Sequence, residues 1–507
     1  MSSSFENNKR IAKNTLFLYF RSIITLAIGL YTNRVILAQL GVSDFGIYNI
    51  VGSVIVLFSF IQNTMTNATS RFFTFDLGKG DFEQLKKTFN LSVVIHIFSA
   101  LVILILGETV GLWFLNTRLV IPVERMDAAN FVYQFSIFSA CIGILQVPYT
   151  VVITAYERMK IFAYAVLVEA TLKLVIVLVL GLASVDKLKL YSILLFSIFV
   201  IMIVFYRIYC HKYFLETHFK WFWNKKMFLE RLGFSGWMTL GWISVVVSVQ
   251  GINMLLNIFH GVIANAAYGI MNQVSGAVNQ FTNSYTMAVN PQIIKSCAKN
   301  DFDYLYSLIF RSIKFAFFLM LAFVIPLFLN MDFLLHLWLK TVPLYAVFFC
   351  QWILVYNLIN ILGIIISTAV VATAKIKTLN IIGCILTTCG FVAIYILFKN
   401  GFSPKIISIA NIIGVIISVL ITIFLSKNYI QFPVFIFIKS VLLKIVFVSC
   451  IVLPLPVWIS FKFDNWRALF ITSGVFFIIY IPCVFLIGLS TNERKFLVDK
   501  IREKFIN

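Results

Sequence analysis

The chain has 507 residues, of which 61% are hydrophobic and only 12% are charged, and its mean hydropathy is +0.96. A soluble core does not need that much apolar surface, so this composition excludes an ordinary soluble protein. The net charge of +21 would suggest nucleic acid as a partner of a soluble protein, but the loops of a membrane protein account for it below.

Apolar runs of at least 18 residues, long enough to cross about 30 Å of hydrocarbon, recur along the whole chain. Their Leu, Ile, Phe and Val content favours helices, whereas a membrane β-barrel would show alternating segments of about ten residues. We therefore predict an all-α integral membrane protein with about 14 transmembrane helices. The runs are centred near residues 25, 57, 102, 142, 172, 199, 244, 276, 319, 359, 388, 415, 448 and 479.

The distribution of Lys and Arg predicts the orientation of these helices. If the N-terminus and every second loop are cytoplasmic, those segments contain 27 Lys and Arg residues against 10 in the opposite loops. This asymmetry is what the positive-inside rule expects of a chain with both ends in the cytoplasm. The basic charge therefore needs no nucleic-acid partner, and the first apolar run is interpreted as a retained span rather than a cleaved signal peptide.

The first span contains a charged residue, Arg21, about eight residues or 12 Å from its start. An arginine at this depth can snorkel to the cytoplasmic headgroups. It can also face a hydrated cavity and pair with an anionic substrate, because guanidinium suits phosphate geometry. Both interpretations stay open.

The segment TNRVILAQLGVSDFGIYNIV, residues 32–51, joins the first span to the second. Gly41 and Gly46 are predicted to shape a tight turn here, and Tyr48 to help build the hairpin. After the second span, Asp81 precedes a predicted cytoplasmic helix and Gln84 follows three residues later, which is typical of a helix N-cap. We interpret Asp81 as structural.

The fifth span contains Glu169 and Lys173, which are four residues apart and can pair on one helix face. Pairing would explain how a bilayer tolerates both charges. The alternative is that Glu169 is a site for a coupling proton or sodium ion.

The chain contains an internal repeat. Shifting the sequence by 220 residues matches 14 of 60 positions between 33–92 and 253–312, where roughly four would agree by chance. Asp81 thereby corresponds to Asp301, and spans 1–6 correspond to spans 7–12 in the same orientation. Parallel repeats are related by an axis along the membrane normal, and in transporters the substrate path lies between the halves. We predict an N-lobe at 1–215, a C-lobe at 216–430, and two further helices with a cytoplasmic tail at 431–507.

Polar residues follow one face of the eighth span and recur at equivalent positions of the second. Amides facing lipid would cost free energy, so both faces are expected to contact protein or a hydrated cavity between the halves. The candidate cavity residues are Asn272, Asn279, Asn283 and Thr286 in span 8, and Ser59, Asn63 and Thr66 in span 2.

No motif for catalysis, metal binding or ATP hydrolysis is present. HExxH, GxSxG, CxxC and a P-loop are all missing from the sequence, and the eight cysteines are scattered. We therefore predict a protein that is not an enzyme and that needs no metal or cofactor.

The segment at 32–51, with its Arg34, Leu-Gly and Gly-x-Tyr, resembles the signature of Wzx-type polysaccharide flippases of the MOP superfamily, which also contains the MATE drug exporters. The six-plus-six repeat, the two extra spans and GDFEQLKKTFN after span 2 are similar to that family too. The resemblance implies a MATE-like fold in a bacterial inner membrane. It also implies transport of an undecaprenyl-diphosphate-linked oligosaccharide, coupled to H⁺ or Na⁺, with a glycan polymerase and a chain-length regulator as possible partners. Arg21 would then hold the diphosphate or an acidic glycan, and Arg34 would be the signature arginine.

Two other functions compete with this one. A MATE-like exporter of cationic drugs needs a buried carboxylate, and spans 1, 2, 7 and 8 have none. A membrane-embedded glycan polymerase or acyltransferase would be expected to show a long periplasmic loop or a buried catalytic histidine.

Overall fold

The computed structural model describes residues 2–56, 59–117, 121–182, 184–339, 342–463, 465–491 and 493–495. These residues are almost all helical and contain no strand, which confirms the predicted all-α membrane fold. Within these described residues, eleven helices are long and apolar enough to cross a membrane. The spans expected near residues 25, 57 and 276 are not among them. Residues 57 and 58 lie outside the described part, and the helix through 276 contains the amide-rich face, which lowers its hydropathy.

The described chain divides into two compact units. Unit 1 comprises Met1–Ile243 and Met287–Asn300, and unit 2 comprises Ser244–Thr286 and Asp301–Asn507. One long helix, α8 (Lys225–Ala298), begins in unit 1, continues through unit 2 and ends in unit 1.

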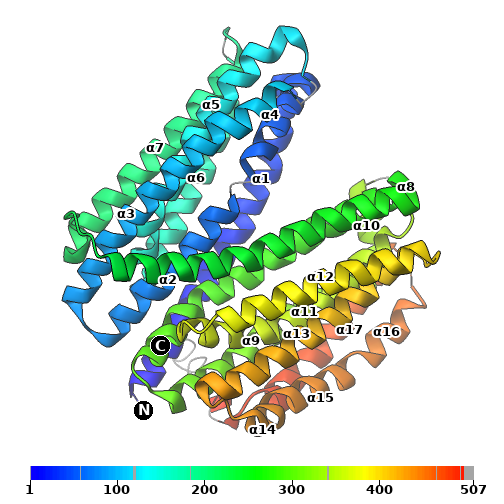
Figure 1. The fold of residues 1–507 in the computed structure, drawn as a ribbon. Coiled ribbons are helices and arrows are strands. Elements are labelled where there is room, and N and C mark those ends of the chain that lie inside the picture. Colours follow the sequence, from blue (N-terminus) through cyan, green and yellow to red (C-terminus); the bar gives the residue numbers. More distant parts are fainter. Residues whose placement is uncertain are drawn as a thin grey trace, which may run out of the picture. The chain divides into compact units, whose positions relative to one another are not determined.

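Unit 1 is a bundle built around one central helix. α5 packs against α2, α3 and α7, and α1 packs along α6 (Figure 1). Short 3-10 or π turns interrupt or join these elements at Gly107–Gly111, Val123–Arg125 and Leu215–Thr217. The helices are α1 (Ser2–Val56), α2 (Ser59–Lys79), α3 (Phe82–Leu106), α4 (Leu112–Thr117), α5 (Met126–Ala155), α6 (Met159–Leu180) and α7 (Lys187–Tyr213).

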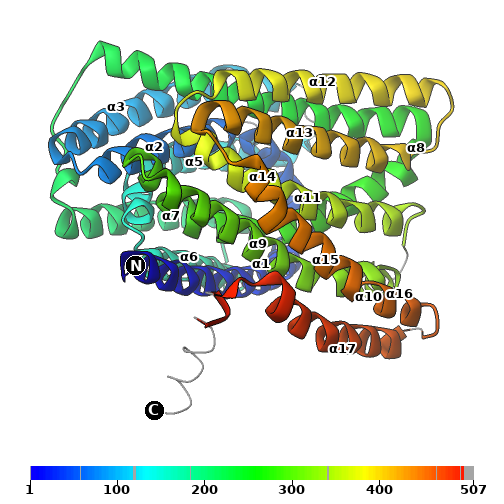
Figure 2. The same ribbon diagram turned by 90° about the horizontal axis from the view of Figure 1, so that it is seen from below.

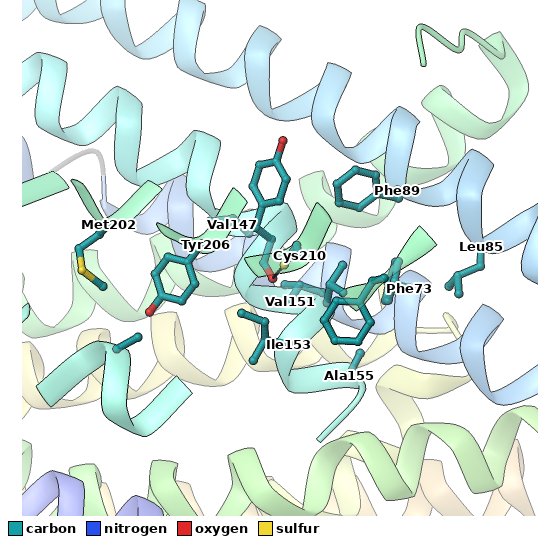
Figure 3. Packing of buried hydrophobic residues seen from close by; sticks show 14 of the residues in the cluster. Phe73, Leu85, Phe89, Val147, Val151, Ile153, Ala155, Met202, Tyr206 and Cys210 are labelled. Atoms are coloured by element: carbon teal, nitrogen blue, oxygen red, sulfur yellow. Dashed lines mark hydrogen bonds between the residues drawn. The ribbon is translucent and has the colours of Figure 1, made fainter. Parts of the chain in front are cut away.

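The core of unit 1 includes a cluster where α2, α3, α5, α6 and α7 converge. Phe73, Phe89 and Tyr206 are almost completely buried in it (Figure 3). The cluster extends to Ala155, the last residue of α5, so the turn between α5 and α6 is anchored on a packed surface.

Unit 2 contains the remaining helices. α11 packs against both α9 and α13, α12 packs on α13, and α14 leads into α15 and α16 (Figure 2). Lys314 on α9 forms a buried ion pair with Glu493, Nζ to Oε2 at 2.8 Å, which fixes the chain after α17. The helices are α9 (Phe302–Leu329), α10 (Met331–Leu339), α11 (Ala346–Ala372), α12 (Lys377–Lys399), α13 (Ile406–Ile430), α14 (Val434–Phe437), α15 (Leu443–Val452), α16 (Pro454–Ser460) and α17 (Asn465–Cys483), with π turns at Ile438–Leu442 and Val484–Gly488.

The two copies of the repeat share an unusual backbone conformation. Gly41 interrupts α1 with φ 77° and ψ 171°, and Gly261, its partner 220 residues later, interrupts α8 with φ 76° and ψ −174°. L-residues rarely adopt this conformation, because their Cβ approaches the neighbouring carbonyl. The matching break divides each long helix into two segments at the same point of the repeat.

We expect Gly41→Ala to lower the free energy of unfolding by about 1–2 kcal/mol, because alanine is strained at a positive φ. SDS-induced unfolding of the purified protein measures this change. Gly29→Ala is the matched control, since Gly29 lies in the same helix with an ordinary φ, and a Cβ there also meets no atom within 4 Å. Equal effects of the two substitutions would contradict the strain argument.

Candidate functional site

Arg21 lies on α1 against the neighbouring helices of unit 1. Its guanidinium carbon is 5.4 Å from the ring centroid of Phe162 on α6, and Nη2 donates to Ser22 Oγ at 3.5 Å. The side chain is half-buried. Tyr206 of α7, buried in the core, is within electrostatic range of it. A guanidinium stacked on a ring in this way keeps its apolar part packed.

Glu169 and Lys173 form an ion pair on α6, with Nζ 2.6 Å from Oε1. The Lys173 ammonium also lies 5.6 Å from the ring centroid of Phe199 on α7. Glu169 is the second charged group within electrostatic range of Tyr206. Arg21 and Glu169, distant in sequence, thus both influence one buried tyrosine electrostatically.

The polar face of α8 is largely accessible. Asn272 and Asn279 are half-buried and Asn283 is exposed, whereas Thr286 is buried and donates to the backbone oxygen of Asn283 at 3.1 Å. Asn279 Nδ2 donates to Ser275 Oγ at 3.2 Å.

A further amide, Asn357, joins this face from α11. Its Nδ2 donates to the same Ser275 oxygen at 3.4 Å, and its side chain is buried. Asn357 was not among the sequence-predicted residues, because it lies in an apolar run without a polar period of its own.

The equivalent face of α2 is partly described. Asn63 is exposed, as is its repeat partner Asn283. Thr66 is half-buried and donates to the backbone oxygen of Gln62 at 2.8 Å. The side chain of Ser59 lies outside the described residues.

The signature segment is fixed by an ion-pair cluster that sequence reasoning missed. Arg125 donates to Asp44 through Nε at 2.9 Å and to Asp186 through Nη1 at 2.7 Å. Asp186 also caps α7 by accepting from the backbone of Leu188 at 3.0 Å. Asp44 belongs to the second span's hairpin, so the three residues tie α1, α5 and α7 together at one end of unit 1.

The other predicted structural residues have local roles or are not described. Tyr48 packs edge-on against Tyr191, with ring centroids 5.2 Å apart. Asp81 Oδ1 accepts from the backbone of Gln84 at 2.9 Å, and Asp301 from that of Tyr304 at 3.2 Å, so both cap helices. The side chain of Arg34 and the surroundings of Gly46 lie outside the described residues.

Solved structures share this fold. An outward-facing multidrug-resistance MATE family transporter of the MOP superfamily aligns with a TM-score of 0.71 at 12% identity, covering 83% of this chain and 96% of its own. The fold is that of MOP-superfamily transporters. A point mutant of the Vibrio cholerae MATE transporter VcmN aligns with a TM-score of 0.72 at 17% identity, over 85% of this chain and 98% of its own.

A third similar structure is a MOP-superfamily transporter from Pyrococcus furiosus, for which a different function is suggested by the reversed polarity of its binding pocket. It aligns with a TM-score of 0.68 at 12% identity, covering 83% of this chain and 96% of its own. No protein-family model matches the sequence, and no curated protein is significantly similar to it. At these identities the MOP fold is shown, and the substrate is a separate question.

The Arg125 cluster predicts an acid-sensitive fold. Hydrogen bonds from Arg125 hold the pKa of Asp186 below its usual value, although partial burial opposes them. Because the folded-state pKa is depressed, the stabilisation is present above the unfolded pKa of about 3.9 and is lost as pH falls through the folded value. We expect the midpoint temperature of thermal unfolding of the purified protein to decrease when the pH is lowered below about 4. Asp186→Asn should remove part of this pH dependence. A parallel pH profile in the variant would contradict this.

Proposed function

We propose that this protein moves an undecaprenyl-diphosphate-linked oligosaccharide repeat unit from the cytoplasmic to the periplasmic leaflet of a bacterial inner membrane. Transport by alternating access, coupled to H⁺ or Na⁺, is part of this proposal. The observation that supports it most is the chemistry of the polar faces of α2 and α8. Residues 59–70 and 244–290 contain amides and hydroxyls but no Asp or Glu.

The accessible amides are suited to sugar hydroxyls. An amide side chain offers two donors and one acceptor oxygen, which is the mixture that a glycan requires. Asn63 and Asn283 are exposed at equivalent positions of the two copies. Unpaired polar groups facing hydrocarbon each cost several kcal/mol, so exposed amides on apolar helices are better explained by contact with water or a polar substrate.

Arg21 is proposed to bind the diphosphate. It is the only described arginine of the first span, and its guanidinium lies over Phe162 with the phenol of Tyr206 nearby. The equivalent position of the second copy is Gly241, so the charge comes from one copy alone. Glu169 is proposed as the coupling site, with Lys173 balancing its charge when no ion is bound.

The MATE-like alternative is supported by the fold, because two of the similar structures are described as MATE transporters. A small organic cation would be recognised by a carboxylate, and the polar faces of α2 and α8 have none. If the flippase proposal is right, a glycan polymerase and a chain-length regulator are the partners that would use the transported product.

Arg21→Ala is expected to abolish surface-glycan assembly in cells that lack the native gene, without lowering protein abundance, because the anion loses its cation. Arg21→Lys should retain part of the activity, since the charge remains without the planar donor pair. Arg311→Ala is the matched control, because Arg311 Nε donates to Ser307 of its own helix at 3.1 Å. Normal glycan assembly by Arg21→Ala would leave snorkelling as the interpretation of Arg21.

The drug-export alternative predicts a different result. Cells that produce the wild-type protein should expel ethidium no faster than cells with an empty vector, because the accessible polar faces lack a carboxylate. Glu169→Gln should slow glycan assembly at least about tenfold if the carboxylate carries the coupling ion. Ethidium efflux that Glu169→Gln eliminates would favour the MATE-like function instead.

A further inference from the structure

Two segments of the second copy pack inside unit 1. The repeat assigns residues 225–243 and 287–300 to the second copy, yet both belong to the compact unit formed by the first. They are the start and the end of α8, and the sequence places both on the cytoplasmic side. Buried polar contacts hold both segments, in addition to apolar packing.

Glu157 holds the end of α8. It lies in the turn between α5 and α6 with φ 59°, and its side chain is only 1% exposed. Both of its carboxylate oxygens are 2.8 Å from Gln292 Nε2, and Oε1 is also 2.8 Å from Lys295 Nζ. A carboxylate this deeply buried is costly unless it is paired, so the turn and the end of α8 depend on each other.

The turn that presents Glu157 is itself well supported. Tyr156 stacks on Phe214 with ring centroids 4.5 Å apart and donates to Glu216 through its hydroxyl. Ala155 and Phe214 belong to the core cluster of unit 1, to which the end of α5 is attached (Figure 3). Asn14 of α1 donates to the Glu157 backbone oxygen at 3.5 Å. Glu157 is therefore presented from a rigid surface.

The ends of α2 and α8 cross at Gly78 and Ala298, which are equivalent positions of the two copies of the repeat. A Cβ added at Gly78 would lie 3.0 Å from the Cβ of Ala298 and 2.9 Å from the Cα of Lys295. Gly78 and Ala298 are 220 residues apart, which is the repeat offset. Equivalent positions of the two copies therefore touch each other within unit 1, and the close approach needs a glycine at 78.

Arg231 holds the start of α8 in a similar way. It is buried, and it donates to Thr88 through Nη2 to Oγ1 at 2.7 Å and through Nη1 to the backbone oxygen at 3.1 Å. Thr88 Oγ1 in turn donates to Asp76 of α2. The Phe72 ring lies under Arg231 at 5.2 Å and packs edge-on against Phe234 of α8.

We propose that Glu157, Gln292 and Lys295, together with the Gly78–Ala298 crossing, form a cytoplasmic latch that must release before substrate enters from the cytoplasm. The requirement for release rests on the proposed transport function. The latch itself is a property of unit 1. Its charged and polar contacts come from a rigid turn, and Ala288 of α8 packs beside them in an apolar cluster with Leu18 and Met159.

Labelling of Cys297 tests the latch without a substrate. Cys297 is buried beside the crossing, and the other seven cysteines are replaced so that it is the only thiol. In inside-out vesicles, Glu157→Gln and Lys295→Gln should each raise the rate of labelling by a membrane-impermeant maleimide about tenfold or more, because each removes the buried ion pair that holds the end of α8. Glu157→Lys combined with Lys295→Glu should return the rate towards that of the parent protein.

Glu108→Gln is the matched control for the labelling experiment. Glu108 also accepts from a glutamine, Gln134 Nε2 at 3.0 Å, but at the opposite end of α3. Glu108→Gln should leave the labelling rate of Cys297 unchanged. Size-exclusion profiles identify variants that fail to fold. If one of the single variants fails to fold, the labelling rate of the Glu157→Lys and Lys295→Glu double variant still tests the latch. An unchanged rate in folded Glu157→Gln protein would overturn the latch.

A crosslink tests the release step. Glu157→Cys with Lys295→Cys, in a protein without other cysteines, can be joined by a short reducible bis-methanethiosulfonate crosslinker, because the two native side chains meet at 2.8 Å. The crosslink should arrest surface-glycan assembly, and reduction should restore it. Crosslinked protein that assembles glycan normally would overturn the release step while leaving the flippase function intact. If Cys297 labelling responds as expected but the parent protein itself supports no glycan assembly, the proposed function is wrong and the latch is retained.

Discussion

Inside a bilayer a polar side chain must be paired or must face water, and this constraint determines how the described polar residues are arranged. Glu169 is neutralised by Lys173 on its own helix, and Lys314 by Glu493, which is distant in sequence. Glu157 is surrounded by Gln292 and Lys295. The exposed amides Asn63 and Asn283 have no comparable enclosure among the described residues, and the constraint therefore makes them the natural place to expect a polar substrate.

The two copies of the repeat share their helix geometry but differ in their charged residues. The break at Gly41 recurs at Gly261 with nearly the same backbone angles, so the helix geometry is common to both copies. The charges are not. Asp44, which binds Arg125, corresponds to buried Ala264, and Arg21 corresponds to Gly241. This asymmetry of charge is compatible with the proposed substrate, because a lipid diphosphate with a sugar chain has two chemically different ends.

Hydropathy and local patterns were enough to predict the all-α membrane fold and most of its spans, because a span and its caps depend on neighbouring residues in the chain. The all-α fold follows from the apolar runs, and the N-caps at Asp81 and Asp301 can be recognised within a few residues. The Arg125 cluster could not be predicted in this way, because its partners Asp44 and Asp186 lie 81 and 61 residues away. Glu157 gave no signal either, since a glutamate in a basic loop is expected to be solvated. Only the packing of α8 against the turn reveals that it is buried.

The contact between Gly78 and Ala298 has a consequence for how the protein can change over evolutionary time. A Cβ at position 78 would meet the backbone of Lys295 as well as the side chain of Ala298. Making residue 298 smaller would therefore not make room for a larger residue at 78. Glycine should be retained at position 78 across related proteins, whatever residue stands at 298, so the first copy is less free to diverge here than the second.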